Sequence, residues 1–273
     1  MSLEKREQAA VARWKPGRRW YYPLLAALVI RTSKFVMTSM NTLEIEGMER
    51  FEQLRQGRDR GRGLLTYSNH VSLFDDPILV SNFSLPRYEE IRWTATDAIN
   101  FFGSRPKAWL FTAGRGVPIV RGAGINQLGF HFLRDRLAEG AWVQIFPEGG
   151  RTRDPQALMR DSFKAGIGRL MAEARPLVLP WYHYGMHEVL PVGAKLPRRG
   201  HTVRVVFGEP LDCDDAYVRE TAERAGDPDL QGPPLWEALT AAAHDALRSL
   251  ELEVHPTASR SAARPQEAPG EPA

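Results

Sequence analysis

The chain has 273 residues, which is long enough for one domain with a sizeable hydrophobic core. Its hydrophobic content of 43% and charged content of 25% are those of an ordinary globular protein. The single cysteine, Cys213, excludes an internal disulfide.

The net charge of +3 hides an asymmetry between the two ends of the chain. Residues 1–40 carry eight basic and two acidic side chains, whereas residues 209–273 carry five basic and fourteen acidic ones. A basic segment beside an apolar run suits an anionic membrane surface better than a nucleic acid, because the chain has no nucleic-acid-binding motif. The alternative is a basic helix end that is simply solvated.

The N-terminal region, residues 1–40, is predicted to hold a helix at the membrane interface. Residues 1–19 are polar and mixed in charge, so we expect them to be poorly ordered. The apolar run at 20–30 is too short to cross a membrane, which takes about 20 residues. The aromatic side chains of Trp14, Trp20, Tyr21 and Tyr22, beside the basic Arg18 and Arg19, are typical of headgroup depth. The alternative is a helix that packs on the domain's own core.

Residues 41–225 are predicted to form an α/β domain. Runs rich in β-forming residues occur at 43–47, 63–69, 91–96, 116–121, 142–147, 176–184 and 202–208. Helical patterns occur at 48–56, 77–83, 105–113, 124–139 and 162–174. This alternation predicts a mainly parallel central sheet with helices on both faces.

The C-terminal part is predicted to follow that domain as a linker and a helix that packs against the sheet domain, with a partner-binding role as the alternative. Residues 226–253 comprise a linker rich in Gly, Pro and Asp and an amphipathic helix with apolar side chains at spacings of three and four. Residues 254–273 are rich in Pro, Ala, Glu and Ser, and we expect them to be disordered.

The most informative stretch is 69–77, Asn-His-Val-Ser-Leu-Phe-Asp-Asp-Pro. His70 and Asp75 are five residues apart, so they meet only if the chain turns between them. A capping aspartate followed by Pro77 favours such a turn at the start of a helix. A carboxylate folded back onto an imidazole activates a hydroxyl. The alternative is a capping aspartate and a histidine satisfied in the core.

A second stretch, Phe-Pro-Glu-Gly-Gly-Arg at 146–151, places Glu148 and Arg151 on a glycine-rich turn after another apolar run. In parallel sheets, sites form at the carboxyl ends of strands. Both His70 and Glu148 follow predicted strands, which indicates one shared site.

Together these blocks resemble those of the glycerolipid (lysophosphatidate-type) acyltransferase superfamily, and in particular its tafazzin branch of phospholipid–lysophospholipid transacylases. The similarity extends over about residues 14–212. Further similar blocks are Trp-Thr-Ala-Thr-Asp at 93–97, Phe-Lys-Ala-Gly-Ile-Gly-Arg-Leu at 163–170 and Gly-Met-His-Glu-Val-Leu-Pro at 185–191.

The resemblance implies a role for each matching residue. His70 is the implied general base on the hydroxyl of a lysophospholipid, and Asp75 orients it. The implied substrate-binding residues are Asn69, Arg121, Glu148, Gly149 and Arg151. Guanidinium groups suit phosphate, although either arginine would also fit a strand end in water.

The acyl donor stays open on these residues. Gly150 replaces the threonine usual in lysophosphatidate acyltransferases, whereas tafazzins generally lack an arginine like Arg151. The resemblance implies a phospholipid donor, with acyl-CoA or acyl carrier protein as the alternative donor of a 1-acylglycerol-3-phosphate acyltransferase. A non-catalytic membrane-binding protein is a remote alternative.

We expect no cofactor, no metal and no nucleic-acid partner. His183 and His187 have the spacing of zinc ligands on a helix, but Gly185 between them disfavours a helix. A nucleophilic Ser72 has no evident activating geometry. The expected location is a membrane surface, with peripheral or monotopic attachment. In a bacterium this is the cytoplasmic face, and in a eukaryote the organelle stays open.

Overall fold

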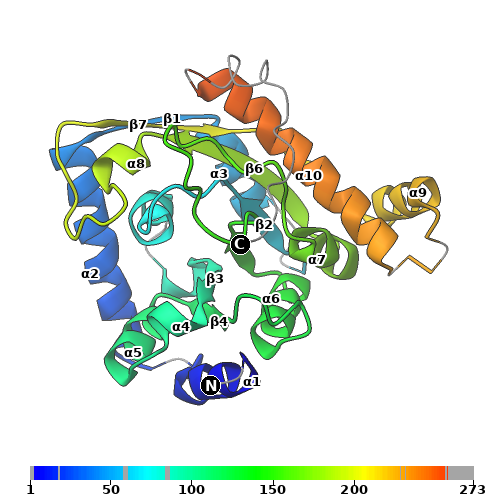
Figure 1. Cartoon of the computed structure of the whole chain (residues 1–273), viewed down its shortest axis with the longest axis horizontal. Helices are drawn as coiled ribbons and strands as arrows, with labels where there is room; N and C mark the ends of the chain where they lie inside the picture. The colour runs from blue at the N-terminus through cyan, green and yellow to red at the C-terminus, as the bar shows by residue number, and fades with distance from the viewer. Residues whose placement is uncertain are drawn as a thin grey trace, which may run out of the picture.

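A computed structural model describes residues 3–17, 19–57, 61–83, 87–227, 229–230, 232–255 and 257. Its centre is an eight-stranded, mainly parallel sheet surrounded by helices (Figure 1), as the sequence predicts. The strands are β1 (Thr42–Glu46), β2 (Leu64–Tyr67), β3 (Trp93–Asp97), β4 (Gly116–Ile119), β5 (Trp142–Ile145), β6 (Leu177–Tyr184), β7 (Thr202–Phe207) and β8 (Leu211–Asp212).

The strand order is β1-β7-β6-β2-β5-β3-β4, with β8 paired to β6. Strand β2 lies at the centre and runs parallel to both β6 and β5. Strand β7 is antiparallel to β6 and parallel to β1. Tyr67 pairs with Ile145 in the register of β2 and β5, so the segments after these two strands start side by side.

The longer helices are α1 (Leu3–Arg13), α2 (Tyr22–Phe35), α3 (Met48–Gly57), α5 (Arg105–Ala113), α6 (Leu128–Ala138), α7 (Gly166–Ala174), α9 (Asp215–Ala225) and α10 (Pro233–Val254). Single turns are η1 (Val36–Met40), η2 (Asp75–Leu79), η3 (Val80–Asn82), η4 (Tyr88–Glu90), α4 (Ala98–Phe101) and α8 (Met186–Val189). The helix predicted at 77–83 thus starts earlier, at Asp75. It consists of a π turn followed by a 3₁₀ turn.

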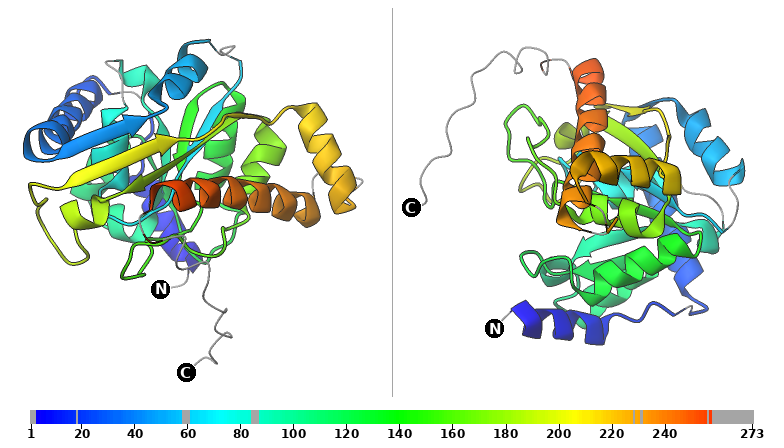
Figure 2. Two further views of the ribbon diagram at one scale, coloured as in Figure 1. Left: turned by 90° about the horizontal axis from the view of Figure 1, so that it is seen from above. Right: turned by 90° about the vertical axis from the view of Figure 1, so that its right-hand side faces the viewer.

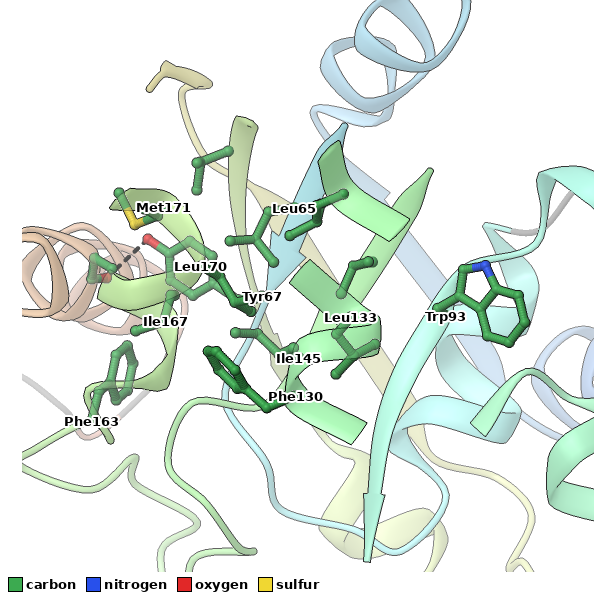
Figure 3. Close-up of a cluster of buried hydrophobic side chains, with 14 of the residues drawn as sticks. Leu65, Tyr67, Trp93, Phe130, Leu133, Ile145, Phe163, Ile167, Leu170 and Met171 are labelled. Atoms are coloured by element: carbon green, nitrogen blue, oxygen red, sulfur yellow. Dashed lines mark hydrogen bonds between the residues drawn. The ribbon is translucent and has the colours of Figure 1, made fainter. Parts of the chain in front are cut away.

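Both faces of the sheet are buried, which explains the unbroken apolar runs of its central strands. Adjacent residues Leu64 and Leu65 of β2 are both fully buried but belong to different hydrophobic clusters, because successive side chains point to opposite faces. Figure 2 shows α10 along one face and α3 along the other. In Figure 3, Tyr67 and Ile145 of the sheet pack towards Ile167 and Leu170 of α7.

The prediction that residues 1–19 are poorly ordered is wrong for the greater part of this segment. Helix α1 buries Ala10 and is followed by buried Trp14, whose indole donates a hydrogen bond to the Gly116 carbonyl at 2.9 Å. The four-residue spacing of Ala10 and Trp14 gives an otherwise polar segment one face that joins the core. Residues 1, 2 and 18 lie outside the described residues.

Helix α2, which carries the predicted interfacial run, has two different faces. Tyr22 and Ala26 are buried, and the helix packs beside η2, η3 and α5. On the other side Leu24 is 66% and Leu28 is 61% exposed. The helix therefore packs on the domain and also presents an apolar face. Within the described residues, no helix combines the length and apolarity that a membrane crossing requires.

The predicted C-terminal amphipathic helix is confirmed as α10, which buries Leu239, Ala243 and Leu247. Its backbone is tied to the sheet, because the Tyr67 hydroxyl donates to the Ala243 carbonyl at 2.9 Å. The helix ends at Val254. Of the segment predicted to be disordered, residues 256 and 258–273 lie outside the described residues.

Candidate active site

The histidine of the first block follows β2 in a short segment fixed by Asn69. The Asn69 side chain is fully buried and bonds both backbone groups of His183, at 2.9 and 3.0 Å, which joins the end of β2 to β6. Asn69 therefore does not line the pocket described below. The structure gives it a supporting position instead of the predicted contact with substrate.

His70 and Asp75 do meet. The Asp75 carboxylate is fully buried, and its Oδ2 lies 2.9 Å from His70 Nδ1. The same oxygen accepts hydrogen bonds from the backbone N–H groups of Val71 and Ser72, at 2.8 and 2.9 Å. The chain therefore turns between His70 and Asp75, as predicted, but Asp75 does not cap a helix: it is the first residue of η2, whose N-cap Phe74 makes no side-chain hydrogen bond. The hydrogen bonds of Asp75 also assign the proton of the neutral ring to Nδ1, which leaves Nε2 as the proton acceptor.

The pKa of Asp75 reflects opposing effects. Burial would raise it, but the nearby imidazole of His183, the hydrogen bond from His70 and the backbone bonds together hold the pKa below its ordinary value. Asp75 is therefore ionised whenever the protein is near neutral pH. A fixed carboxylate of this kind stabilises the imidazolium that forms when His70 takes a proton.

His183 is a member of this cluster that the sequence did not single out for catalysis. It is fully buried in β6, and its Nε2 lies 3.3 Å from the Asn69 carbonyl and 3.6 Å from Asp75 Oδ2. Burial lowers its pKa, partly offset by Asp75, so it is neutral. Among the described residues, no three His, Cys, Asp or Glu side chains are grouped to hold a metal.

Glu148 lies under the site and does not face the pocket. It is 1% exposed, and its two carboxylate oxygens accept backbone hydrogen bonds from His70 at 2.7 Å and Arg160 at 3.0 Å. Gly149 follows with a φ of +71°, which favours glycine and turns the chain away from β5. Glu148 and Gly149 therefore shape the loop, and neither lines the pocket in front of His70.

A pocket of about 250 Å³ lies in front of the histidine. The His70 ring, 16% exposed, stacks on Phe146 with centroids 4.4 Å apart, and both line this pocket. The predicted phosphate-binding residues Arg121 and Arg151 line it as well. The structure therefore brings the predicted base and both predicted arginines into one space.

Two further arginines, Arg153 and Arg160, line the same pocket. No sequence pattern indicates these two arginines, because the irregular segment at 152–165 has no periodicity that places its side chains. Arg153 also borders a second cavity of about 600 Å³, which lies beside Val71 and His187.

The buried carboxyl of Glu148 predicts a pH dependence of stability. Burial raises the pKa of Glu148 to about 7, from an ordinary value of 4.5. Since the folded protein then binds this proton more tightly than the unfolded chain, the free energy of unfolding falls as pH rises through this interval. We expect the free energy of unfolding of wild type, minus that of Glu148→Gln, to fall by about 3 kcal/mol between about pH 4 and pH 8.

Urea unfolding of the two proteins at several pH values measures this difference, because the contributions of all other carboxylates cancel. Parallel stability curves for wild type and the Gln variant would contradict the assignment.

Comparison with known proteins gives the same family as the sequence blocks. The Acyltransferase family matches residues 42–184. Tafazzin of Drosophila melanogaster is 31% identical over 246 residues, 87% of this chain and 63% of that protein. Taffazin of Dictyostelium discoideum is 36% identical over 193 residues, 66% of each protein. N-acylphosphatidylethanolamine synthase of Arabidopsis thaliana is 32% identical over 224 residues, 77% of this chain and 78% of that protein.

The chain thus spans somewhat less than two thirds of the length of the first two relatives. The family match covers both loops of the site, those of His70 and of Glu148, and ends at Tyr184 in β6. The chain belongs to the acyltransferase superfamily as a tafazzin-like member.

Proposed function

We propose that the protein is a glycerophospholipid O-acyltransferase that moves a fatty acyl chain from a phospholipid to the hydroxyl of a lysophospholipid. The observation that carries the proposal is the His70–Asp75 pair, bonded at 2.9 Å, at the wall of a pocket lined by four arginines. A positioned base suits a hydroxyl acceptor, and guanidinium groups suit the phosphate of a lipid headgroup.

The reaction needs no acyl-enzyme. His70 Nε2 takes the proton of the acceptor hydroxyl, and that oxygen attacks the ester carbonyl carbon of the donor lipid. The tetrahedral intermediate collapses with cleavage of the bond to the donor's glycerol oxygen. That oxygen takes the proton back from His70, so the products are an acylated acceptor and a new lysophospholipid. Asp75 keeps the ring oriented and stabilises the transient imidazolium.

The phospholipid donor is supported by the similarity to two tafazzins. Acyl-CoA or acyl carrier protein is the alternative donor. The Arabidopsis relative is named for making an N-acylphosphatidylethanolamine, which suggests an amine as a second kind of acceptor for the same base. Direct comparison of these donors and acceptors with the purified protein separates the possibilities.

We also propose that the protein attaches to a membrane surface, peripherally or monotopically, through α2 and its neighbour α5. Leu28 of α2 is 61% exposed, and Trp20, which lies just before the helix, is 81% exposed. Trp109 of α5 continues this surface, since it is 44% exposed and its ring lies 5.7 Å from that of Tyr21. Exposed apolar and aromatic side chains near basic ones fit the headgroup boundary of a bilayer.

Removal of the base tests the mechanism. His70→Ala leaves the fold intact, because the ring lies at the pocket wall, but lowers acyl transfer about 100- to 10,000-fold. Ser72→Ala is the matched control. Ser72 is buried and donates to the Leu190 carbonyl at 3.2 Å, so its loss removes a structural bond and no nucleophile. Transfer of labelled acyl chains between lipids in mixed micelles measures both variants.

Wild-type turnover in folded His70→Ala would overturn the mechanism. Loss of transfer in folded Ser72→Ala to the same extent would point to a serine nucleophile instead.

A charge on the exposed face of α2 tests the attachment. Leu28→Glu should weaken binding to vesicles containing anionic phospholipid about tenfold or more, because apolar burial is lost and a repelled carboxylate is gained. The control is Leu252→Glu, at a side chain that is 43% exposed and belongs to α10 instead of α2 or α5. Co-sedimentation with vesicles measures both. Equal binding of the two variants would contradict an interface formed by α2.

A further inference from the structure

The four arginines of the pocket do not have equal electrostatic partners. Arg121 is paired with Asp97, its Nε lying 3.0 Å from Asp97 Oδ2. Asp76, the other carboxylate that lines the pocket, accepts a hydrogen bond at 3.0 Å from Arg92 Nε. Both acids are therefore already neutralised.

The other three arginines, Arg151, Arg153 and Arg160, have no carboxylate within salt-bridge distance in the described part of the chain. Burial and the nearby charges of Arg153 and Arg121 lower the pKa of Arg151, although the charge of Asp75 partly offsets them. Like charges gathered in one pocket are stabilised by a bound anion. The positive charge of these three guanidinium groups is larger than the single negative charge of one phosphodiester.

Arg160 is held in place at several points. Its backbone N–H donates to Glu148 Oε2 at 3.0 Å, and its carbonyl lies 3.2 Å from Nε2 of His244 in α10. Its guanidinium Nη2 donates to the Arg151 carbonyl at 2.9 Å. The side chain is therefore directed to the pocket by the same carboxylate that holds His70.

Gly150 provides the space for this arrangement. A Cβ atom at Gly150 would lie 3.3 Å from Nη1 of Arg121 and 3.6 Å from Nη2 of Arg160, so the two guanidinium groups converge on this glycine from different parts of the chain. A larger side chain such as threonine would extend into that space. Gly150 stands where lysophosphatidate acyltransferases usually have threonine, and it is this glycine that leaves room for the side chain of Arg160.

We infer that Arg160 and Arg153 form a second phosphate-binding position, which takes the phosphodiester of the lipid that donates the acyl chain, while Arg121 and Arg151 take the phosphate of the acceptor. The inference rests on the proposed transfer between two phospholipids, because such a reaction brings two phosphates to one base. Three guanidinium groups without a carboxylate partner, next to Arg121 with its partner Asp97, supply the positive charge that two phosphodiesters require.

The test measures the KM of each lipid separately in mixed micelles. Arg160→Gln should raise the KM of the diacyl phosphatidylcholine donor about tenfold to a hundredfold, the effect of losing a charge-assisted contact, and change the KM of lysophosphatidylcholine less than about threefold. Arg153→Gln should also raise the KM of the diacyl phosphatidylcholine donor. The Arg153 side chain makes no hydrogen bond to any described residue, so it tests the position without disturbing the loop. Arg219→Gln, at an exposed side chain of α9, is the control for loss of one positive charge.

Equal effects of Arg160→Gln on both KM values, or on neither, would overturn the inference and leave one phosphate position. Calorimetric titration with short-chain diacyl phosphatidylcholine below its micelle concentration provides a readout that does not depend on turnover. Wild type should bind it, and Arg160→Gln should weaken binding by the same factor as the donor KM. If wild type binds this lipid through Arg160 but transfers no acyl chain, the proposed function fails and the phosphate position stands. If wild type transfers acyl chains and Arg160→Gln leaves both binding and donor KM unchanged, the second phosphate position fails and the proposed function stands.

Discussion

The buried carboxylate of Glu148 is the interaction on which the site depends. One of its oxygens holds the backbone of His70 and the other holds the backbone of Arg160, although these residues are 90 positions apart in the chain. A third bond, from Thr152 N–H to the His70 carbonyl at 2.8 Å, closes the same assembly. Two backbone donors stabilise the charged form, whereas burial opposes it, so the group is held at a balance between the two.

The fold makes this contact possible. Strands β2 and β5 are parallel neighbours in register, so the segments that carry His70 and Glu148 leave the sheet together at its carboxyl edge. Hydrogen bonds between the strands fix the backbone at this edge. Loop residues are fixed by these bonds only where they lie close to a strand end. His70 and Glu148 both lie within three residues of a strand end.

Residues further along the loop need other support, and α10 supplies it. The buried Glu251 accepts a hydrogen bond from Met159 N–H at 2.7 Å, and His255 Nε2 lies 2.7 Å from the Gln156 carbonyl. Together with His244 at the Arg160 carbonyl, these contacts attach the loop of Arg160 to a helix that lies outside the family match of 42–184. The C-terminal helix thus belongs to the support of the pocket.

The sequence predicted the sheet and the meeting of His70 with Asp75 because both follow from local signals, namely the alternation of apolar runs and the turn-forming residues Asp75, Asp76 and Pro77. It could not place Arg160, since no periodic element fixes that side chain. It also assigned Trp14 to the membrane interface, whereas the structure buries it, because an aromatic side chain beside basic ones suits either place. Asn69 was assigned to the substrate from its motif alone, whereas its amide is consumed by the backbone of His183. A buried amide and an exposed one look the same in a sequence.

The orientation of His70 is the central claim, and ¹⁵N NMR of the histidine side chains measures it directly. In the neutral ring of wild type the proton should reside on Nδ1, hydrogen-bonded to Asp75, and the Nε2 resonance should be that of an unprotonated nitrogen. Asp75→Asn should remove this preference. A proton on Nε2 in the neutral wild-type ring would contradict the account, because the nitrogen that faces the acceptor hydroxyl would then be unable to take its proton.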